Sequence, residues 1–414
     1  MRKVTGLQCI RCGKEYKLKE TKYTCLSCGG NLQVTYDYNL IKKRLTYKTL
    51  DANPERSIWR YLDILPIEDA DAVPPVQVGW TPLYRAEKLG ESVGISNLYI
   101  KDDGRNPTCS FKDRASAVTV ARALELEEPV ITAASTGNAA ASLACQTGSL
   151  DMKTIIFVPK SAPAPKVAQL LVFGAHVVMV DGTYDDAFDL CVSASKEYGW
   201  YNRNTGYNPF TREGKKTCAF EICEQLDWEA PDKVVVSVGD GNIISGLWKG
   251  FMDFNRLGII EKLPQMVAVQ AEHSNAIKNA LEGDGEIKPV SGQTVADSIS
   301  VSIPRDGMAA VQALKESGGF AVSVTDAEIL SAIPELARGV NVFAEPAASA
   351  AYAGLKKAVA SGQIKDGETV CVVITGNGLK DINSAMKAVG KPYLIKPRLE
   401  DLKQLVAREN IIAR

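Results

Sequence analysis

Short, continuous apolar runs alternate with longer helical patterns along most of this chain, and this alternation limits its fold more than any other feature. A strand that is apolar on both faces is expected in a parallel sheet covered by helices on both sides. Helix starts are predicted at Asp326, as a cap, and at residues 183–186, where acidic residues occupy the first turn. The sequence therefore predicts an α/β fold with parallel-rich sheets. The apolar runs span residues 98–100, 130–132, 154–158, 176–180, 234–238, 266–269 and 370–374.

Length and charge narrow the class of protein further. At roughly 100 to 200 residues per domain, 414 residues suggest two or three domains. Lys and Arg number 48 and Asp and Glu 49, so the formal net charge is -1, which argues against a nucleic-acid or membrane partner. We find no secretory signal and no apolar run of about 18 residues, so we expect a cytoplasmic location. The only histidines, His176 and His273, exclude a mechanism built on a histidine cluster.

Four cysteines near the start of the chain have the spacing Cys9-x2-Cys12-x12-Cys25-x2-Cys28. Two Cys-x-x-Cys turns can bring four thiolates around one tetrahedral ion, and the glycines beside them permit tight turns. We interpret this segment as a zinc-ribbon-like module with a structural Zn ion. Iron, a redox dithiol pair and a site without metal are the alternatives. The other cysteines lie in apolar contexts and are predicted to fill the core of a protein in a reducing compartment.

Four loops after predicted strands carry residues suited to ligand chemistry, because ligands of open parallel sheets bind where strands end and helices begin. The loops contain, in order, a lysine behind a phenylalanine, small hydroxyl residues with glycine at a helix start, a Gly-Asp-Gly-Asn turn, and a Thr-Gly-Asn-Gly segment. Glycines and helix starts expose backbone N–H groups to a phosphate or carboxylate. A solvated lysine, a plain helix cap and simple turns are the alternatives for each loop alone. The loops span residues 101–114, 133–142, 237–243 and 374–381.

Together these segments resemble the β-family of pyridoxal-phosphate enzymes, which have the tryptophan-synthase-like fold (fold type II), and within it the threonine synthases. The resemblance runs from Gly79-Trp80-Thr81-Pro82-Leu83 to Asp381, and residues 106–114 match the family's cofactor-lysine motif. Residues 159–182 and 213–217 also resemble the family, and a cysteine ribbon occurs in many threonine synthases.

The resemblance implies a fold of two α/β domains behind the cysteine module. The module would comprise residues 1–36, the large cofactor-binding domain residues 37–104 and 216–414, and a small mobile domain residues 105–215. The cofactor, pyridoxal 5'-phosphate, would lie between the two domains. A homodimer is also expected from the resemblance alone.

The same resemblance assigns roles to individual residues. Lys112 would hold the cofactor as a Schiff base and act as acid and base, and Asn138 would bind the ring's 3-oxygen. Thr375 would face the pyridine nitrogen, where a hydroxyl does not keep the ring protonated as a carboxylate would. Asp240, an acid in the predicted phosphate-binding turn, is expected to point away from the phosphate. The cofactor's phosphate would rest on Gly239, Asp240, Gly241, Asn242 and Ile243, and the substrate's α-carboxylate on Ser135 and Thr136.

The implied reaction converts O-phospho-L-homoserine and water to L-threonine and phosphate. An alternative is replacement or elimination on another phosphorylated amino acid, such as a cysteate-synthase-like use of O-phosphoserine. A distant alternative from another class is a non-catalytic binding protein on the same fold.

The chain departs from the family pattern at several positions. Cys109 stands where the family usually has glycine. Residues 205–206 and Thr211 stand where threonine synthases usually have the Asn-Ser pair and the arginine that hold the substrate's phosphate. Arg203 or Arg212 could compensate, because a guanidinium can reach a phosphate from a neighbouring position. The sequence therefore predicts the cofactor more firmly than the substrate.

Overall fold

The structure, a computed structural model, describes residues 3–411. These residues form three sheets. The first is a small antiparallel sheet of order β2-β1-β3, and residues 3–36 around it are called the cysteine module below. The second has the order β12-β11-β10-β13-β5-β4 and is parallel except for β4, and the third is parallel with the order β8-β7-β6-β9. The strands are β1 (Val4–Cys9), β2 (Glu15–Tyr16), β3 (Leu32–Tyr36), β4 (Leu83–Arg85), β5 (Asn97–Asp102), β6 (Val130–Ala134), β7 (Lys153–Pro159), β8 (His176–Val180), β9 (Tyr201–Asn202), β10 (Lys233–Ser237), β11 (Gln265–Ala271), β12 (Phe320–Val324) and β13 (Thr369–Ile374).

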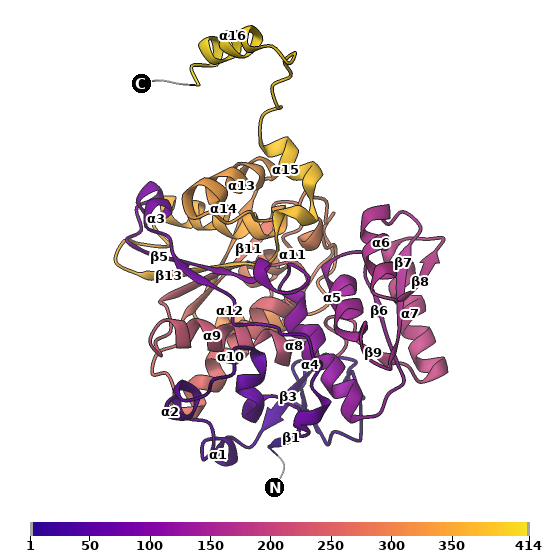
Figure 1. Ribbon diagram of the computed structural model, residues 1–414. Coiled ribbons are helices and arrows are strands. Elements are labelled where there is room, and N and C mark those ends of the chain that lie inside the picture. Colours follow the sequence, from indigo (N-terminus) through magenta and orange to yellow (C-terminus); the bar gives the residue numbers. More distant parts are fainter. Residues whose placement is uncertain (1–2, 412–414) are drawn as a thin grey trace.

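Helices cover both faces of the two parallel sheets, as the apolar strands predict (Figure 1). The α-helices are α1 (Tyr38–Ile41), α2 (Tyr47–Asp51), α3 (Glu87–Val93), α4 (Lys112–Glu125), α5 (Asn138–Thr147), α6 (Ala164–Val172), α7 (Tyr184–Tyr198), α8 (Phe210–Lys215), α9 (Thr217–Gln225), α10 (Asn242–Leu257), α11 (Ala276–Glu282), α12 (Gly307–Glu316), α13 (Asp326–Val340), α14 (Pro346–Ala360), α15 (Ile382–Ala388) and α16 (Leu399–Glu409). Short 3-10 helices span Ile58–Ile64, Ala70–Ala72, Asp103–Arg105, Asp297–Ile299 and Gly378–Lys380. The predicted α/β class is confirmed.

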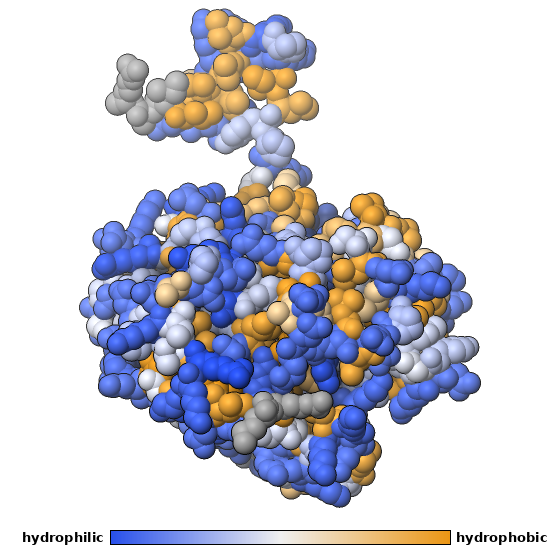
Figure 2. Space-filling view, turned by 60° about the horizontal axis from the view of Figure 1, so that its bottom comes forward, coloured by the Kyte–Doolittle hydropathy of each residue, from blue (hydrophilic) through white to orange (hydrophobic). Residues whose placement is uncertain are grey.

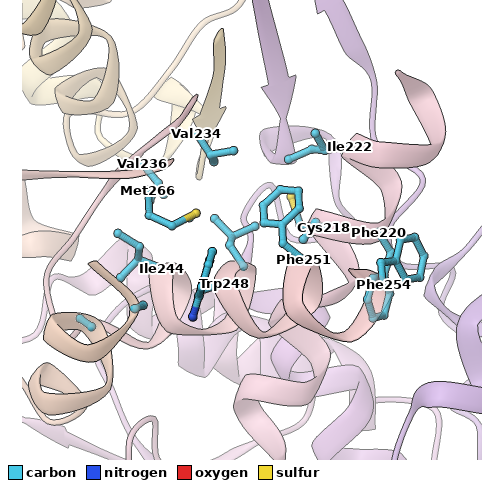
Figure 3. Packing of buried hydrophobic residues seen from close by; sticks show 14 of the residues in the cluster. Cys218, Phe220, Ile222, Val234, Val236, Ile244, Trp248, Phe251, Phe254 and Met266 are labelled. Carbon is cyan, nitrogen blue, oxygen red and sulfur yellow. The ribbon is translucent and has the colours of Figure 1, made fainter. Parts of the chain in front are cut away.

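Successive residues of β10 enter different cores, which explains why this strand is apolar throughout. Val234 and Val236 pack with Phe251 of α10 on one face of the six-stranded sheet (Figure 3), and Val235 packs with Tyr352 of α14 on the other. All of these side chains are buried. At about 25 cal/mol per Å² of apolar surface, each such side chain stabilises the fold by roughly 1.5–3 kcal/mol. The sheet is therefore a rigid platform for the loops at its carboxyl edge.

The four-stranded sheet and the six-stranded sheet come from separate parts of the chain. Strands β6 to β9 lie between residues 130 and 202, inside the predicted small domain. The six-stranded sheet takes β4 and β5 from before this segment and β10 to β13 from after it. The domain boundaries at residues 36, 104 and 215 stay a prediction.

The two predicted helix starts have different outcomes. Thr183 caps α7, and its hydroxyl and the Asp186 carboxylate form a capping box, so the acidic first turn is confirmed. The prediction of Asp326 as a cap is wrong by one residue. Thr325 is the cap of α13, because its hydroxyl accepts a hydrogen bond from Glu328 N while Glu328 accepts one from Thr325 N. Asp326 instead accepts a hydrogen bond from the Thr294 hydroxyl.

The end of the described chain leaves the body of the molecule. Helix α16 lies away from the rest of the chain in both overall views, and Figure 2 shows apolar side chains on this arm. Leu394 is 98% exposed and Leu399 67% exposed, whereas Leu405 is buried. The arm therefore adds little to the main cores. Within residues 3–411, no helix is both long and apolar enough to cross a membrane.

Candidate active site

A cavity of about 660 Å³ opens where the carboxyl ends of strands from both parallel sheets meet. Residues in or directly after the four loops that the sequence indicates, those following β5, β6, β10 and β13, line part of it, and residues 297–303, which the sequence does not indicate, line another part. Every residue that the resemblance assigns to the cofactor or the substrate lines it. These residues are Lys112, Ser135, Thr136, Asn138, Gly239, Asp240, Gly241, Asn242, Ile243 and Thr375. Their individual roles stay predictions.

Two backbone hydrogen bonds join the segment before Lys112 to the loop after β13. Phe111 N donates to Thr375 O at 2.9 Å, and Asn377 N donates to Cys109 O at 3.0 Å. Cys109 has φ = 60°, a left-handed conformation that glycine adopts without strain. This backbone geometry explains why the family usually has glycine at that position. It also fixes Lys112, the first residue of α4, at the cavity wall beside Thr375.

The amine of Lys112 has no protein partner within residues 3–411: no hydrogen bond or ion pair involves its Nζ atom. Burial lowers the pKa of Lys112; Glu345 and Asp240 partly oppose this, while the positive charge of Arg203 lowers the pKa further. A lysine with a lowered pKa has more of the neutral amine, which is the form that attacks a carbonyl carbon. Lys112 is therefore suited to bind an aldehyde covalently.

A buried ionic network fixes the other side of α4. Arg114 donates to Asp103 at 2.6 and 2.8 Å and to both carboxylate oxygens of Glu221 at 2.5 and 2.8 Å. Lys101 donates to Glu221 at 2.7 Å and to Thr81 O at 2.6 Å. Burial alone would raise the pKa of Glu221, but Arg114 and Lys101 lower it to about 2. The network therefore keeps α4 in place beside the cavity.

The turn between β10 and α10 has the features of a phosphate site. Within the described chain, the backbone N–H groups of residues 239–241 donate to no protein atom. Gly241 has φ = 90°, and a Cβ on Gly239 would lie 2.9 Å from Ile299 Cα, so both positions need glycine. The turn ends at the positive end of α10, which favours an anion. The residues thus fit a phosphate group.

Two side chains of this turn face the protein. The Asp240 carboxylate accepts a hydrogen bond from Arg305 N at 3.0 Å, consistent with the expectation that the backbone binds the phosphate. The Asn242 amide oxygen accepts from Lys215 Nζ at 2.6 Å. Burial, and then the positive charges of Lys112 and Arg203, lower the pKa of Lys215 well below its usual value. The basic side chains Lys112, Arg203 and Lys215 thus line one cavity.

The start of α5 forms a second wall of the cavity. Residues 135–137 precede this helix, and a Cβ on Gly137 would meet no atom within 4 Å, so the segment is open to the cavity. Asn138, the first residue of α5, donates to Glu345 at 3.0 Å. Burial raises the pKa of Glu345, which Asn138 and Lys112 partly oppose.

Sequence reasoning missed Glu345 and Lys215 as members of the site. Glu345 directly precedes the proline that begins α14, and a single carboxylate among small residues was a signal that could have indicated it. Lys215 lies in the segment 213–217 that resembles the family, but a lysine beside another lysine gives no sign of which one faces a cavity.

The structure distinguishes the two arginines that could compensate for the family's missing arginine. Arg212 forms two hydrogen bonds with Asp306, at 2.6 and 2.7 Å, and is outside the cavity lining. Arg203 lines the cavity, and within residues 3–411 its buried Nη2 atom has no hydrogen-bond partner. A buried guanidinium nitrogen without a protein partner is costly unless a ligand meets it. Arg203 is thus the better candidate for binding an anionic group of a ligand.

The four cysteines of the module converge as their spacing predicts. All four Sγ atoms lie within 4.8 Å of one another, with Cys9 and Cys28 at 3.5 Å and Cys12 and Cys25 at 3.6 Å. Four sulfurs at about 2.3 Å from one ion are roughly 3.8 Å apart, so the cluster fits a tetrahedral ion such as zinc. The cluster could therefore hold a metal.

Comparison with known proteins agrees with this geometry. The family model described as "Pyridoxal-phosphate dependent enzyme" matches residues 76–376. A protein from Methanocaldococcus jannaschii named threonine synthase is 42% identical over 96% of this chain and 98% of its own length. A threonine synthase from Methanosarcina acetivorans is 40% identical over 97% of this chain and 98% of its own.

Solved structures show the same fold at low sequence identity. The processed form of threonine deaminase isoform 2 from Solanum lycopersicum has a TM-score of 0.65 at 22% identity, covering 86% of this chain and 95% of its own. Maize serine racemase has a TM-score of 0.62 at 20% identity, covering 80% and 92%. These two likenesses concern the fold alone.

Proposed function

The chain belongs to the family of pyridoxal-phosphate dependent enzymes, and from that premise we propose that it converts O-phospho-L-homoserine and water to L-threonine and phosphate. One observation carries the proposal: among residues 3–411, a lysine amine without a protein partner shares a cavity with a turn that fits a phosphate, a second helix start and an arginine nitrogen without a hydrogen-bond partner. The relatives named threonine synthase, similar over nearly the whole chain, support the choice of reaction.

The residues of the cavity fit pyridoxal 5'-phosphate. Lys112 would hold the aldehyde carbon, residues 239–243 the phosphate, Asn138 the 3-oxygen and Thr375 the pyridine nitrogen. When bound, this cofactor withdraws electrons from the α-carbon of an attached amino acid and so makes its proton acidic. The hydroxyl of Thr375 does not hold a proton on the ring nitrogen as a carboxylate would, which moderates that withdrawal.

The remaining groups suit a phosphorylated amino acid. Ser135 and Thr136 would bind the α-carboxylate at the positive end of α5, and the free nitrogen of Arg203 would bind the substrate's phosphate. Lys112 Nζ, whose pKa is lowered by burial, would accept the proton from the α-carbon and return it later in the reaction. Thr211 is excluded as a phosphate ligand because it bonds to Asn208 O at 2.8 Å, outside the cavity lining.

Water must stay out until the phosphate has left. Two ion pairs join the segments on either side of the cavity: Lys166 with Asp297 at 2.6 Å and Arg305 with Asp185 at 2.7 Å. These pairs would hold the small sheet against the large one while a substrate is bound.

The test is a comparison of two substrates. The purified protein, loaded with pyridoxal phosphate, is mixed with O-phospho-L-homoserine or O-phospho-L-serine plus sulfite, and released phosphate and the amino-acid product are measured. We expect phosphate and L-threonine from phosphohomoserine alone. Turnover of phosphoserine to cysteate would replace this proposal with the cysteate-synthase-like alternative, and failure to bind any cofactor would favour the non-catalytic one.

We also propose that the cysteine cluster holds one structural zinc ion.

A further inference from the structure

One contact of the cysteine module with the segments around the active site comes from Asn31, next to its second Cys-x-x-Cys turn. Asn31 follows Cys28 by three positions, and its carbonyl accepts a hydrogen bond from Ile10 N, which lies in the first turn. Its side-chain amide leaves the module and donates to Asp306 at 2.8 Å and to Arg305 O at 2.7 Å. The position of this amide is thus set by the fold around the four sulfurs.

Asp306 is a buried acceptor that joins the module to the phosphate-binding turn. It is 1% exposed, and besides Asn31 it accepts hydrogen bonds from Arg212, from Ser245 at 2.9 Å and from Asn242 Nδ2 at 2.6 Å. Its own backbone N–H donates to Asp240 O at 2.8 Å. Both Asp240 and Asn242 belong to the turn that fits the cofactor's phosphate, so Asp306 fixes that turn from behind.

The module also holds the segment that carries Arg203. The hydroxyl of Tyr23, which lies between the two Cys-x-x-Cys turns, accepts a hydrogen bond from Asn202 N at 2.8 Å. The Tyr23 ring stacks on Tyr207, with the centroids 4.7 Å apart and the planes at 26°. The module therefore touches loops from both parallel sheets, one on each side of the cavity.

From these contacts we infer that the cysteine module is a positioning element of the active site, which sets the affinity for pyridoxal phosphate through Asn31 and Asp306. A metal ion that holds the four sulfurs together would keep Asn31 aimed at Asp306, and its loss would release the phosphate-binding turn. Asn31 touches neither cofactor nor substrate, so it is a positioning residue. This inference rests on the proposed role of residues 239–243 but is independent of which amino acid is the substrate.

The test compares two amide side chains of the same segment. Asn31→Ala removes the hydrogen bonds to Asp306 and Arg305, whereas Gln33→Ala removes only a 3.1 Å bond to Gln8 inside the module. For the full chain with its bound zinc quantified, the Kd for pyridoxal phosphate and the unfolding temperature are measured. A hydrogen bond to a charged group corresponds to roughly a tenfold effect, so the Kd of Asn31→Ala should rise about tenfold. Gln33→Ala should keep the wild-type Kd; Asn31→Ala should also unfold at a lower temperature, so both Kd values are measured where both variants are fully folded.

Removal of zinc by a chelator sharpens the result. If the module acts through Asn31, the chelator raises the cofactor Kd of the wild-type chain but adds little in Asn31→Ala, because the two changes interrupt one connection. A cofactor Kd for Asn31→Ala within twofold of wild type, or an equal rise in Gln33→Ala, would overturn the inference. A protein that binds the cofactor tightly yet turns over neither substrate would refute the proposed function and leave this inference standing.

Discussion

Lys101 and Lys112 stand at opposite ends of one loop, and their surroundings differ completely. Lys101 is buried and donates to Glu221, Thr81 O and Gln225. Lys112 faces the cavity and has no hydrogen-bonding partner among residues 3–411, although burial lowers its pKa. The same contrast separates Arg114, which binds the carboxylates of Asp103 and Glu221, from Arg203, whose Nη2 has no hydrogen-bond partner in the described part of the chain. A buried cation with a complete set of partners holds the fold, and one with an incomplete set indicates a ligand.

The largest effect is expected for Lys112→Ala. Loss of the amine that binds the cofactor and moves the α-proton should reduce turnover by at least about 10³-fold. The free energy of unfolding should stay the same or increase, since no hydrogen bond is lost. Phosphate release, the visible absorption of bound cofactor and urea denaturation measure these outcomes. A variant with full turnover would disprove the assigned role.

Glu221→Gln tests the fully partnered cations, because Glu221 is the carboxylate that Lys101 and Arg114 share. Arg114 and Lys101 would lose their shared carboxylate, and breaking a buried ion pair costs roughly 3–5 kcal/mol of unfolding free energy. The pKa of Glu221 is lowered to about 2 from the ordinary 4.5, so its contribution is present above pH 4.5 and lost as the pH falls toward 2. Urea denaturation across that pH range should show this dependence in the wild type and a weaker one in the variant. A loss below 1 kcal/mol at neutral pH would contradict the network's role.

Arg203→Met should affect catalysis rather than stability. Removing a guanidinium that binds a phosphate costs about 2–3 kcal/mol, so kcat/KM for O-phospho-L-homoserine should fall roughly 100-fold. Arg212→Met is the matched comparison: it leaves Asp306 without its cation and, at saturating pyridoxal phosphate, should chiefly lower the unfolding temperature. An unchanged kcat/KM in Arg203→Met would show that the substrate's phosphate is bound elsewhere.

A pH measurement on Arg203→Met isolates its effect on Lys112. The positive charge of Arg203 is one cause of the lowered pKa of Lys112, whereas Glu345, Asp240 and Asp103 act in the opposite direction. Without Arg203 the pKa of Lys112 rises, so the neutral amine forms only at higher pH. The rate at which added pyridoxal phosphate is bound covalently, followed by absorbance against pH, should therefore have its midpoint at higher pH in the variant. A midpoint at lower pH would contradict this electrostatic account.

The smallest effect concerns the backbone before Lys112. Cys109→Gly relieves a left-handed conformation, which is worth about 1–2 kcal/mol, while glycine loses more entropy on folding, so a net gain of about 0.5–1 kcal/mol is expected. Cys145→Gly, inside α5, should instead lose about 1 kcal/mol. Urea denaturation distinguishes the two signs, and a destabilised Cys109→Gly would refute the strain.

Features that depend on local sequence patterns, such as strands and the loops after them, could be predicted from the sequence. Strand β8 has the predicted bounds, residues 176–180, because its apolar run is continuous, whereas β12 was missed because residues 323–326 were interpreted as a helix start. The cavity-lining loops after β5, β6, β10 and β13 were found because they follow predicted strands, whereas the cavity-lining residues 297–303 were not found. Glu345 and Asp306 were not, since their importance lies in contacts with Asn138 and Asn31, which are distant in sequence. Such pairings are set by tertiary packing, which a single sequence does not display.

Strand β13 lies between β5 and β10 in the middle of the large sheet, although it is the last strand of the described chain to be synthesised. Until residue 374 has been synthesised, β5 and β10 each expose an unpaired edge, and Thr375 is not yet beside Lys112. A nascent chain therefore cannot capture the vitamin-derived cofactor early, and a product truncated before β13 should aggregate instead of accumulating as a partly active enzyme.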